Sequence, residues 1–294
     1  MPNPADDKFR DPIAGFEARR AGLKRARRNR EILFAVAFVS ALGASLYIGE
    51  VRIDRFVEGL PGLFNYVSET LPPIRPDHIV EDVREWYWAF GRWMGLLLDT
   101  IVIAFLGTLL GTLGALVLCF PASRNLMNGR TVYFVTRRLT EFARAVPELV
   151  YALIFVFAFG LGPLPGVLAI AVHTAGALGK LFSEVNENVD MRPVEGVRAA
   201  GGNWFHVIRF AVVPQVTPNF LSYTLLRFEI NVRSASVIGF VGAGGIGQEL
   251  LFVIRQFVYV DVSAIVLMII LTVSLIDIGC EFLRKRAIGE EVRV

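Results

Sequence analysis

Long apolar runs alternate with shorter polar stretches along this chain. Each run holds roughly 18 to 25 residues, and a helix of about 18 residues rises about 27 Å, enough to cross the hydrocarbon core of a membrane. The pattern therefore predicts an all-α polytopic membrane protein with about six transmembrane helices. The runs are residues 32–49, 94–118, 142–160, 164–182, 216–240 and 262–283. Pro147 falls inside the third run, where we expect it to kink the helix.

The polar stretches suggest how the chain is organised around these runs. Residues 1–30 carry nine Lys or Arg. This segment is too long and too basic for a typical cleaved signal. Residues 50–93 include the aromatic cluster Trp86, Tyr87, Trp88 and Trp93, typical of a membrane interface. We expect a basic tail at 1–30, a first transmembrane helix at 31–49 and an extracytoplasmic loop at 50–93. A membrane core is expected to follow at 94–286, and a C-terminus at 287–294. Within the core we expect a loop at 185–215 and a re-entrant, Gly-rich segment at 241–261.

The charge distribution predicts the orientation. Counted on alternating sides of the runs, 20 Lys and Arg lie on the side of the N-terminal tail and six on the other. By the positive-inside rule, both termini and the loop at 185–215 are cytosolic. A hydrophobic content of 54%, a charged content of 19% and a mean hydropathy of +0.53 are too apolar for a soluble protein of this size. The net charge of +3 therefore reflects topology, and we expect membrane lipid and no nucleic acid as a partner.

A polar island lies between the fourth and fifth apolar runs. Pro193 suits the first position of a helix, and Glu195 interacts favourably with the positive end of the helix dipole. Two glycines at 201–202 stop this helix after about two turns. The helix presents Val194 and Val197 on one side, as expected of a segment that docks on a partner.

A second short helix is predicted directly after the glycines. Asn203 suits its cap, and Pro214 is expected to end it. Phe205, Ile208 and Val212 fall on one face at helical spacing.

A glycine-rich segment at 237–247 contains the spacing G-x-G-x-x-G at Gly242, Gly244 and Gly247, with Asp261 further along the chain. This spacing alone would suggest a dinucleotide site, but that site needs a βαβ unit, and an apolar run follows instead. We expect the glycines to break a helix on the outer side and to let two backbones approach closely, which membranes tolerate where lipid is excluded.

The sequence shows no catalytic or metal-binding set. Gly179-Lys180 lacks the earlier glycine and the following Ser or Thr of a phosphate-binding loop, so we expect no ATP hydrolysis by this chain. The three histidines and the two cysteines, Cys119 and Cys280, form no cluster with ligand spacing. We therefore expect no cofactor, metal or disulfide in this chain.

Polar side chains inside the apolar runs are the other functional signal. A charge there is costly and usually faces the bundle interior or a water-filled path, unless it is neutralised by a structural pair. Glu229 and Arg233 are four residues apart, so we expect an intrahelical pair between them. Together the polar groups favour an anion path. They are Arg227, Glu229, Asn231 and Arg233 in the fifth run, Arg144 and Glu148 beside Pro147, and His173 and Lys180 in the fourth run.

The polar island resembles the EAA loop of ABC-importer permeases. Glu195 is followed six positions later by Gly201, and Ala211 to Pro214 supply the hydrophobic ending of that motif. Gly196 and Val197 stand where the motif has its two alanines.

From about residue 96 to residue 286 the chain resembles the permease subunit of phosphonate ABC importers. Outside the EAA loop the resemblance rests on three runs, of which the second is the most specific: residues 144–156, 221–233 and 241–247.

The resemblance implies a type I importer permease similar to methionine importers, in the cytoplasmic (inner) membrane. It implies a homodimer of permeases with two ATP-binding subunits, which bind ATP and magnesium. It also implies an extracytoplasmic solute-binding protein that delivers a phosphonate or related oxyanion. The permease would then move this anion across the membrane by alternating access. The implied coupling residues are Pro193, Val194, Glu195, Val197, Arg198, Ala199, Ala200 and Gly201; the implied path residues are Arg227, Glu229, Asn231, Arg233, Pro147, Glu148 and His173; the implied outer gate is Gly242, Gly244, Gly245 and Gly247.

Three alternatives stay open at this point. The first is an importer of another solute, namely phosphite, phosphate or methionine. The second is a membrane-bound enzyme that uses a dinucleotide at residues 242–247. The third is a structural membrane scaffold, which the docking segment and the polar residues inside the runs disfavour.

Overall fold

The computed structural model describes residues 12–50, 52–127 and 129–288, and within these ranges the chain forms helices and no β-strand. The chain divides into two compact units at residues 67 and 68. The expected all-α class is confirmed for the described part of the chain. The start of the predicted tail, at 1–11, and the end of the predicted C-terminus, at 289–294, lie outside the described residues.

The first unit contains α1 (Pro12–Ile48) and most of α2 (Ile53–Thr70). In α1 the basic segment and the first apolar run form one continuous helix, because Arg, Lys and Ala are good helix formers and no proline separates the two parts. Together with α3 (Ile79–Trp86) in the second unit, α2 shows that the predicted loop at 50–93 contains two helices.

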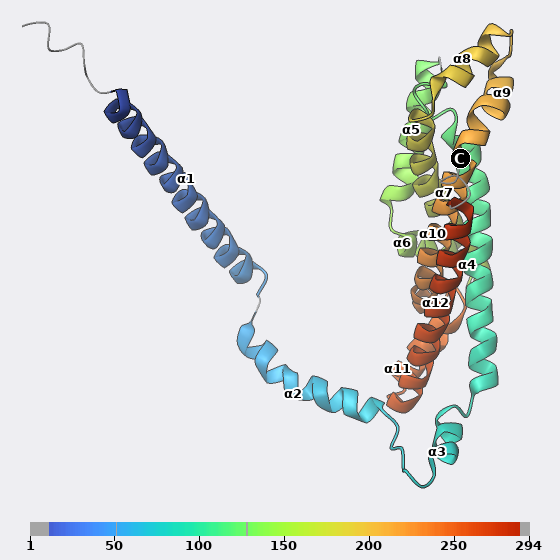
Figure 1. The fold of residues 1–294 in the computed structure, drawn as a ribbon. Helices are drawn as coiled ribbons and strands as arrows, with labels where there is room; N and C mark the ends of the chain where they lie inside the picture. The colour runs from blue at the N-terminus through green and yellow to red at the C-terminus, as the bar shows by residue number, and fades with distance from the viewer. Residues whose placement is uncertain (1–11, 51, 128, 289–294) are drawn as a thin grey trace, which may run out of the picture. The chain divides into compact units, whose positions relative to one another are not determined.

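The second unit is a helical bundle. In Figure 1, α4, α7, α10 and α12 run side by side, with α8 and α9 at one end and α3 and α11 at the other. We call these the α8 end and the α11 end. The helices are α4 (Phe90–Cys119), α5 (Arg130–Ala145), α6 (Glu148–Phe159), α7 (Pro163–Glu187), α8 (Met191–Ala199), α9 (Trp204–His206), α10 (Val213–Ile238), α11 (Ile246–Arg255) and α12 (Tyr259–Ile288).

Four described helices, α1, α4, α7 and α12, are long and apolar enough to cross a membrane. Two bent helix pairs raise the number to six if each pair counts as one span, which matches the six spans expected from the sequence. Both pairs differ locally from the prediction.

The first bent pair corrects the predicted third span. Instead of one helix with a kink, α5 and α6 meet at 88°. The residue before a proline avoids the helical region, and Val146 is extended with φ −81° and ψ 126°. The helix therefore ends at Ala145, and Pro147 precedes the new helix α6.

The second bent pair corrects the predicted role of Pro214. The chain stays helical from Trp204 to Val241, and a π-helical segment at Val207–Val212 lies directly before the proline. A π-turn widens the helix, so the ring of Pro214 is accommodated although it has no N–H to donate. After a glycine turn, α11 continues at 47°, so the predicted re-entrant segment is largely a helix.

Apolar side chains form three clusters along the bundle. At the α8 end, the rings of Phe182 and Phe220 stack with their centroids 3.9 Å apart. At the α11 end, Trp93 is buried with Ile246 and Ile265. Trp93 is therefore a core residue and does not belong to the predicted interfacial belt, whereas Trp88 is exposed.

Two glycines allow α4 and α7 to pack closely together. A Cβ atom built on Gly107 would lie 2.6 Å from Cγ2 of Ile170, and one built on Gly111 would lie 2.6 Å from Cβ of Thr174. Small residues allow transmembrane helices to approach in this way.

We predict that Gly107→Ala destabilises the protein by about 1–3 kcal/mol, because the added methyl group overpacks the α4–α7 contact. Thermal unfolding of the purified protein in detergent measures the effect. Gly95→Ala in the same helix is the matched control, since a Cβ atom there has open space, and it should leave the melting temperature unchanged or higher. Equal melting temperatures for the two variants would contradict the prediction.

Candidate functional site

The docking segment predicted from the sequence begins with helix α8, which is capped by Asp190. The Asp190 carboxylate accepts a hydrogen bond from the backbone N–H of Arg192 and pairs with the Arg192 guanidinium at 2.6 Å. Hydrogen bonds from Arg192 hold the pKa of Asp190 below its usual range. Pro193 is therefore the third helical residue and not the first, although its missing N–H is still harmless in the first turn.

The predicted end of α8 at the two glycines is confirmed. Gly201 has φ +82°, and the N–H of Gly202 donates to the carbonyl of Val197 at 2.9 Å. This is the Schellman arrangement, in which a residue with positive φ closes the last turn. Gly201 supplies that conformation without strain.

The burial along α8 changes the predicted docking face. Val194 is fully buried in the apolar cluster at the α8 end, and Val197 is partly buried against the same cluster. Val194 thus anchors α8 to its own bundle and is not presented to a partner. The exposed residues are Arg192, Pro193, Glu195, Gly196, Arg198, Ala199, Ala200 and Gly201.

The second helix begins as predicted at Asn203, whose side-chain oxygen accepts from the N–H of His206 at 3.0 Å. The predicted common face is wrong in part: Ile208 and Val212 are buried, but Phe205 is 73% exposed. The π-turn shifts the angular spacing between the start of this helix and Val212.

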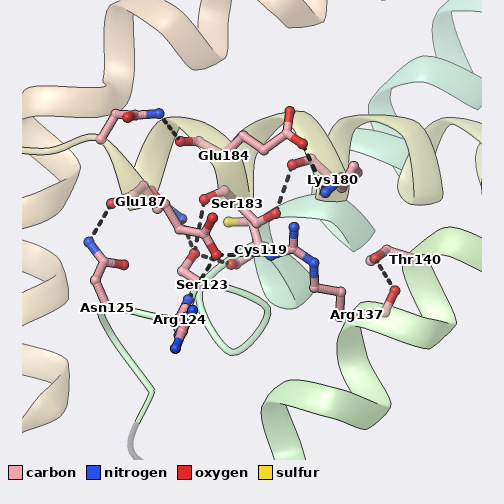
Figure 2. Close-up of polar contacts among 12 residues, drawn as sticks. Cys119, Ser123, Arg124, Asn125, Arg137, Thr140, Lys180, Ser183, Glu184 and Glu187 are labelled. Atoms are coloured by element: carbon pink, nitrogen blue, oxygen red, sulfur yellow. Dashed lines mark hydrogen bonds and ion pairs between the residues drawn. The ribbon is translucent and has the colours of Figure 1, made fainter.

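A polar cluster at the end of α7 joins two loops that the charge distribution predicts to be cytosolic, the α4–α5 loop and the loop at 185–215. Figure 2 shows Glu187 of α7 facing Arg124 and Arg137; its Oε1 accepts from the Arg124 N–H at 3.0 Å and from Arg137 Nη1 at 2.9 Å. Asn125 donates to the carbonyl of Asn186 at 2.8 Å. The α4–α5 loop and α5 are therefore joined to α7 immediately before α8.

A further contact binds the same loop to the second helix. The indole N–H of Trp204 donates to the carbonyl of Leu126 at 3.0 Å. The sequence analysis missed both Glu187 and Trp204, because their partners lie 50 to 78 positions away and leave no local pattern.

The middle of the bundle holds a second cluster around an ion pair. Arg227 Nη2 of α10 and Glu148 Oε1 of α6 are 2.5 Å apart, and each side chain is 13% exposed. His173 of α7 lies beside them, with Nε2 3.6 Å from Glu148 Oε1 and Nδ1 3.0 Å from the carbonyl oxygen of Val146. Glu148 thus contacts two other predicted path residues, Arg227 and His173.

Asn231 is fully buried next to this pair. Its Nδ2 donates to Thr108 at 2.7 Å and to Thr174 at 3.0 Å, and Thr174 also accepts from Arg227 Nε at 3.4 Å. Asn231 therefore joins α10 to α4 and α7 and supports the position of Arg227.

The predicted Glu229–Arg233 side-chain pair is wrong. Arg233 Nη2 faces Asp277 Oδ1 at 3.4 Å, and the buried Glu229 faces Arg284 at 3.6 Å. Both partners belong to α12, so long-range packing overrides the four-residue spacing. Lys180, the other polar residue named in the fourth run, pairs with Glu184 at 2.8 Å.

The glycine turn after α10 is a site of close backbone contact. Gly242, Gly244 and Gly245 have φ of +85°, +83° and +76°, and a Cβ atom on Gly247 would collide with the carbonyl oxygen of Ser236. The Ile246 N–H donates to Thr100 Oγ1 at 2.8 Å. This confirms close backbone approach at the turn, while its role as a gate stays a prediction. No strand flanks the turn in the described residues, so the βαβ unit of a dinucleotide site is absent there.

At the α11 end, hydrogen bonds hold α3 and the residues before it in place. Arg75 binds Asp82 through its backbone N–H and its guanidinium, and these hydrogen bonds hold the pKa of Asp82 below its usual range. Trp86 donates to Val260 and Ser263 at the start of α12.

The family model described as "Binding-protein-dependent transport system inner membrane component" matches residues 107–287. The match covers more than half of the chain, so the protein belongs to this family. It is thus a transport subunit of the inner membrane and not an enzyme, which excludes the dinucleotide enzyme. As such a component it works with a substrate-binding protein and with ATP-binding subunits.

Several curated relatives are similar to this chain. The phosphite transport system permease protein PtxC of Stutzerimonas stutzeri is 39% identical over 85% of this chain and 87% of its own length. The phosphate-import permease protein PhnE of Mycolicibacterium smegmatis is 41% identical over 61% of this chain and 34% of its own length. The putative cryptic phosphonate permease protein PhnE2 of Escherichia coli is 50% identical over 42% of this chain and all of its own length.

Solved structures show the fold. An inward-facing structure of the MetNI methionine ABC transporter covers 68% of this chain and 96% of its own, with 18% identity and a TM-score of 0.57. The predicted type I importer permease fold is therefore confirmed.

We predict that Glu187→Ala loosens the α4–α5 loop, because Arg124 and Arg137 lose their shared acceptor. The cost is about 1 kcal/mol, given that the Glu187 side chain is 28% exposed. Hydrogen exchange over residues 120–129 measures the loosening. Glu184→Ala, one turn earlier, is the control and should leave that loop protected; equal protection in both variants would contradict the role of Glu187.

Proposed function

We propose that this chain, as an inner-membrane component of a binding-protein-dependent transport system, is the permease through which a phosphonate or phosphite anion enters the cell. The observation that carries this proposal is the 39% identity to a phosphite permease over most of both chains. Two relatives with shorter matched regions are named for phosphonate and phosphate, so the supported substrate class is a phosphorus oxyanion. Phosphate is the second candidate, whereas the methionine transporter supports only the fold.

Transport is driven by partner ATPases at the α8 end. That end carries the exposed face of α8, and the counted positive charges favour a cytosolic position for it and for both termini. ATP and magnesium bind the partner subunits. Their closure moves α8, and the bundle switches between inward-open and outward-open packings, as in alternating access.

The path for the anion lies along α6, α7 and α10 in each copy of a homodimer. Arg227 and Arg233 attract the oxyanion, Asn231 supports Arg227, and Glu229 keeps a negative charge beside Arg284. The break at Pro147 precedes Glu148, whose carboxylate contacts Arg227 of α10 and His173 of α7. The glycine turn at 242–247 is the outer gate, where the solute-binding protein delivers its cargo.

We predict ATP-dependent uptake of phosphite or methylphosphonate when the chain is reconstituted in vesicles with its ATP-binding and solute-binding partners. Radiolabelled phosphite, methylphosphonate, phosphate and methionine are compared in parallel. Uptake should need all three components and ATP. Uptake of methionine alone, or of no solute, would refute the proposal, and uptake of phosphate alone would select the second candidate.

We predict that Glu195→Ala and Gly201→Asp each reduce uptake at least about tenfold, because they alter the exposed face and the end of α8. Binding of the ATPase to the purified permease, ATP hydrolysis and uptake are measured together. Glu184→Ala removes an exposed acid at the same end, outside α8, and serves as the control. Full uptake and full ATPase binding by both α8 variants would contradict the docking role.

A further inference from the structure

The ion pair between Arg227 and Glu148 joins residues 79 positions apart inside an apolar bundle. A lone charge in the membrane interior is costly, so each side chain depends on the other for neutralisation. The further contact of Arg227 is the hydroxyl of Thr174, which carries no charge. Among the described residues, Glu148 is the carboxylate that pairs with Arg227.

Glu148 lies at a joint and not within a long helix. It is the first residue of α6 and follows the extended Val146 and Pro147 at the 88° bend. His173 contacts both sides of this joint, at the carbonyl of Val146 and at the carboxylate of Glu148. A change in the bend would therefore move the Glu148 carboxylate relative to Arg227 of α10.

A hollow of about 430 Å³ opens beside the pair. Glu148 and His173 line it from one side, and Arg233 lines it from α10. Arg233 is 53% exposed, and its 3.4 Å distance to Asp277 is long for an ion pair. An anion in the hollow would thus have an available guanidinium at Arg233 and would lie next to the carboxylate that holds Arg227.

Carboxylates and phosphorus oxyanions are bound by arginine in the same way. Each presents two oxygens to the planar fork of the guanidinium. Glu148 Oε1 contacts Arg227 at Nη2 and therefore occupies a position that one oxygen of a tetrahedral oxyanion would take. Both anions cannot use the same N–H groups at once.

We propose that Glu148 is an internal substitute for the transported oxyanion. It occupies Arg227 while the path is empty; the incoming anion displaces it, and the carboxylate then stays beside His173. When the carboxylate returns to Arg227, it expels the anion, so the site releases its cargo instead of retaining it. This inference rests on the proposed function and names the residue that sets the affinity of the path.

The test compares Glu148→Gln with the wild-type permease bound to its ATPase partner in lipid nanodiscs. Equilibrium binding of radiolabelled phosphite is measured, with methylphosphonate and phosphate as competitors. We expect Glu148→Gln to bind phosphite at least about tenfold more tightly and to take it up more slowly in vesicles. Glu249→Gln is the matched control, since Glu249 forms another interhelical pair, with Arg92 at 2.7 Å and away from the hollow; it should bind phosphite like the wild type.

A second variant separates this role from a structural one. Arg227→Gln combined with Glu148→Gln replaces the ion pair by two neutral amides that can still hydrogen-bond and leaves no charge at either position. The proposal expects this double variant to assemble with the ATPase but to lose phosphite uptake and tight binding. Retained uptake by the double variant, or unchanged or weaker phosphite binding by Glu148→Gln, would overturn it. Failure of the wild-type complex to transport any of the three anions would instead refute the proposed function and this inference with it.

Discussion

The hydrocarbon interior offers no water to polar groups, and this constraint governs every polar feature of the bundle. The break between α5 and α6 is tolerated because Pro147 has no N–H to satisfy and because His173 reaches the carbonyl of Val146. The glycine turn before α11 is tolerated because Thr100 accepts from the N–H of Ile246. Irregular backbone occurs where another helix supplies its hydrogen bonds.

Two threonines of α4 make the same arrangement of hydrogen bonds. Thr100 donates its hydroxyl hydrogen to Leu96 one turn earlier, and Thr108 donates to Ala104. Each hydroxyl oxygen is then left as an acceptor for a neighbouring element: Ile246 for the first, Asn231 for the second. With the glycines of α4, which admit α7 closely, this helix acts as the template on which α7, α10 and α11 are assembled.

Periodicity, glycine placement and short motifs predicted the number of spans, the C-terminal end of α8 and the likeness to importer permeases, because these features are encoded locally. Pro147 was recognised, but its 88° bend depends on the packing of α6 against α7, which a single sequence does not show. The partners of Glu229 and Arg233 were predicted wrongly for the same reason, since α12 lies about 50 positions away. Glu187 had no signal, because its partners come from a loop and a helix far along the chain.

Hydrogen bonds fix both ends of α8, and this affects how the helix can transmit a force. Asp190 fixes its first turn, the Gly201–Gly202 turn fixes its last, and Val194 holds its middle in the bundle. A helix with frayed ends would absorb a push by unwinding. A helix secured in this way behaves as a short rigid lever, so a force on its outer face is delivered to α7 and α10 as rotation.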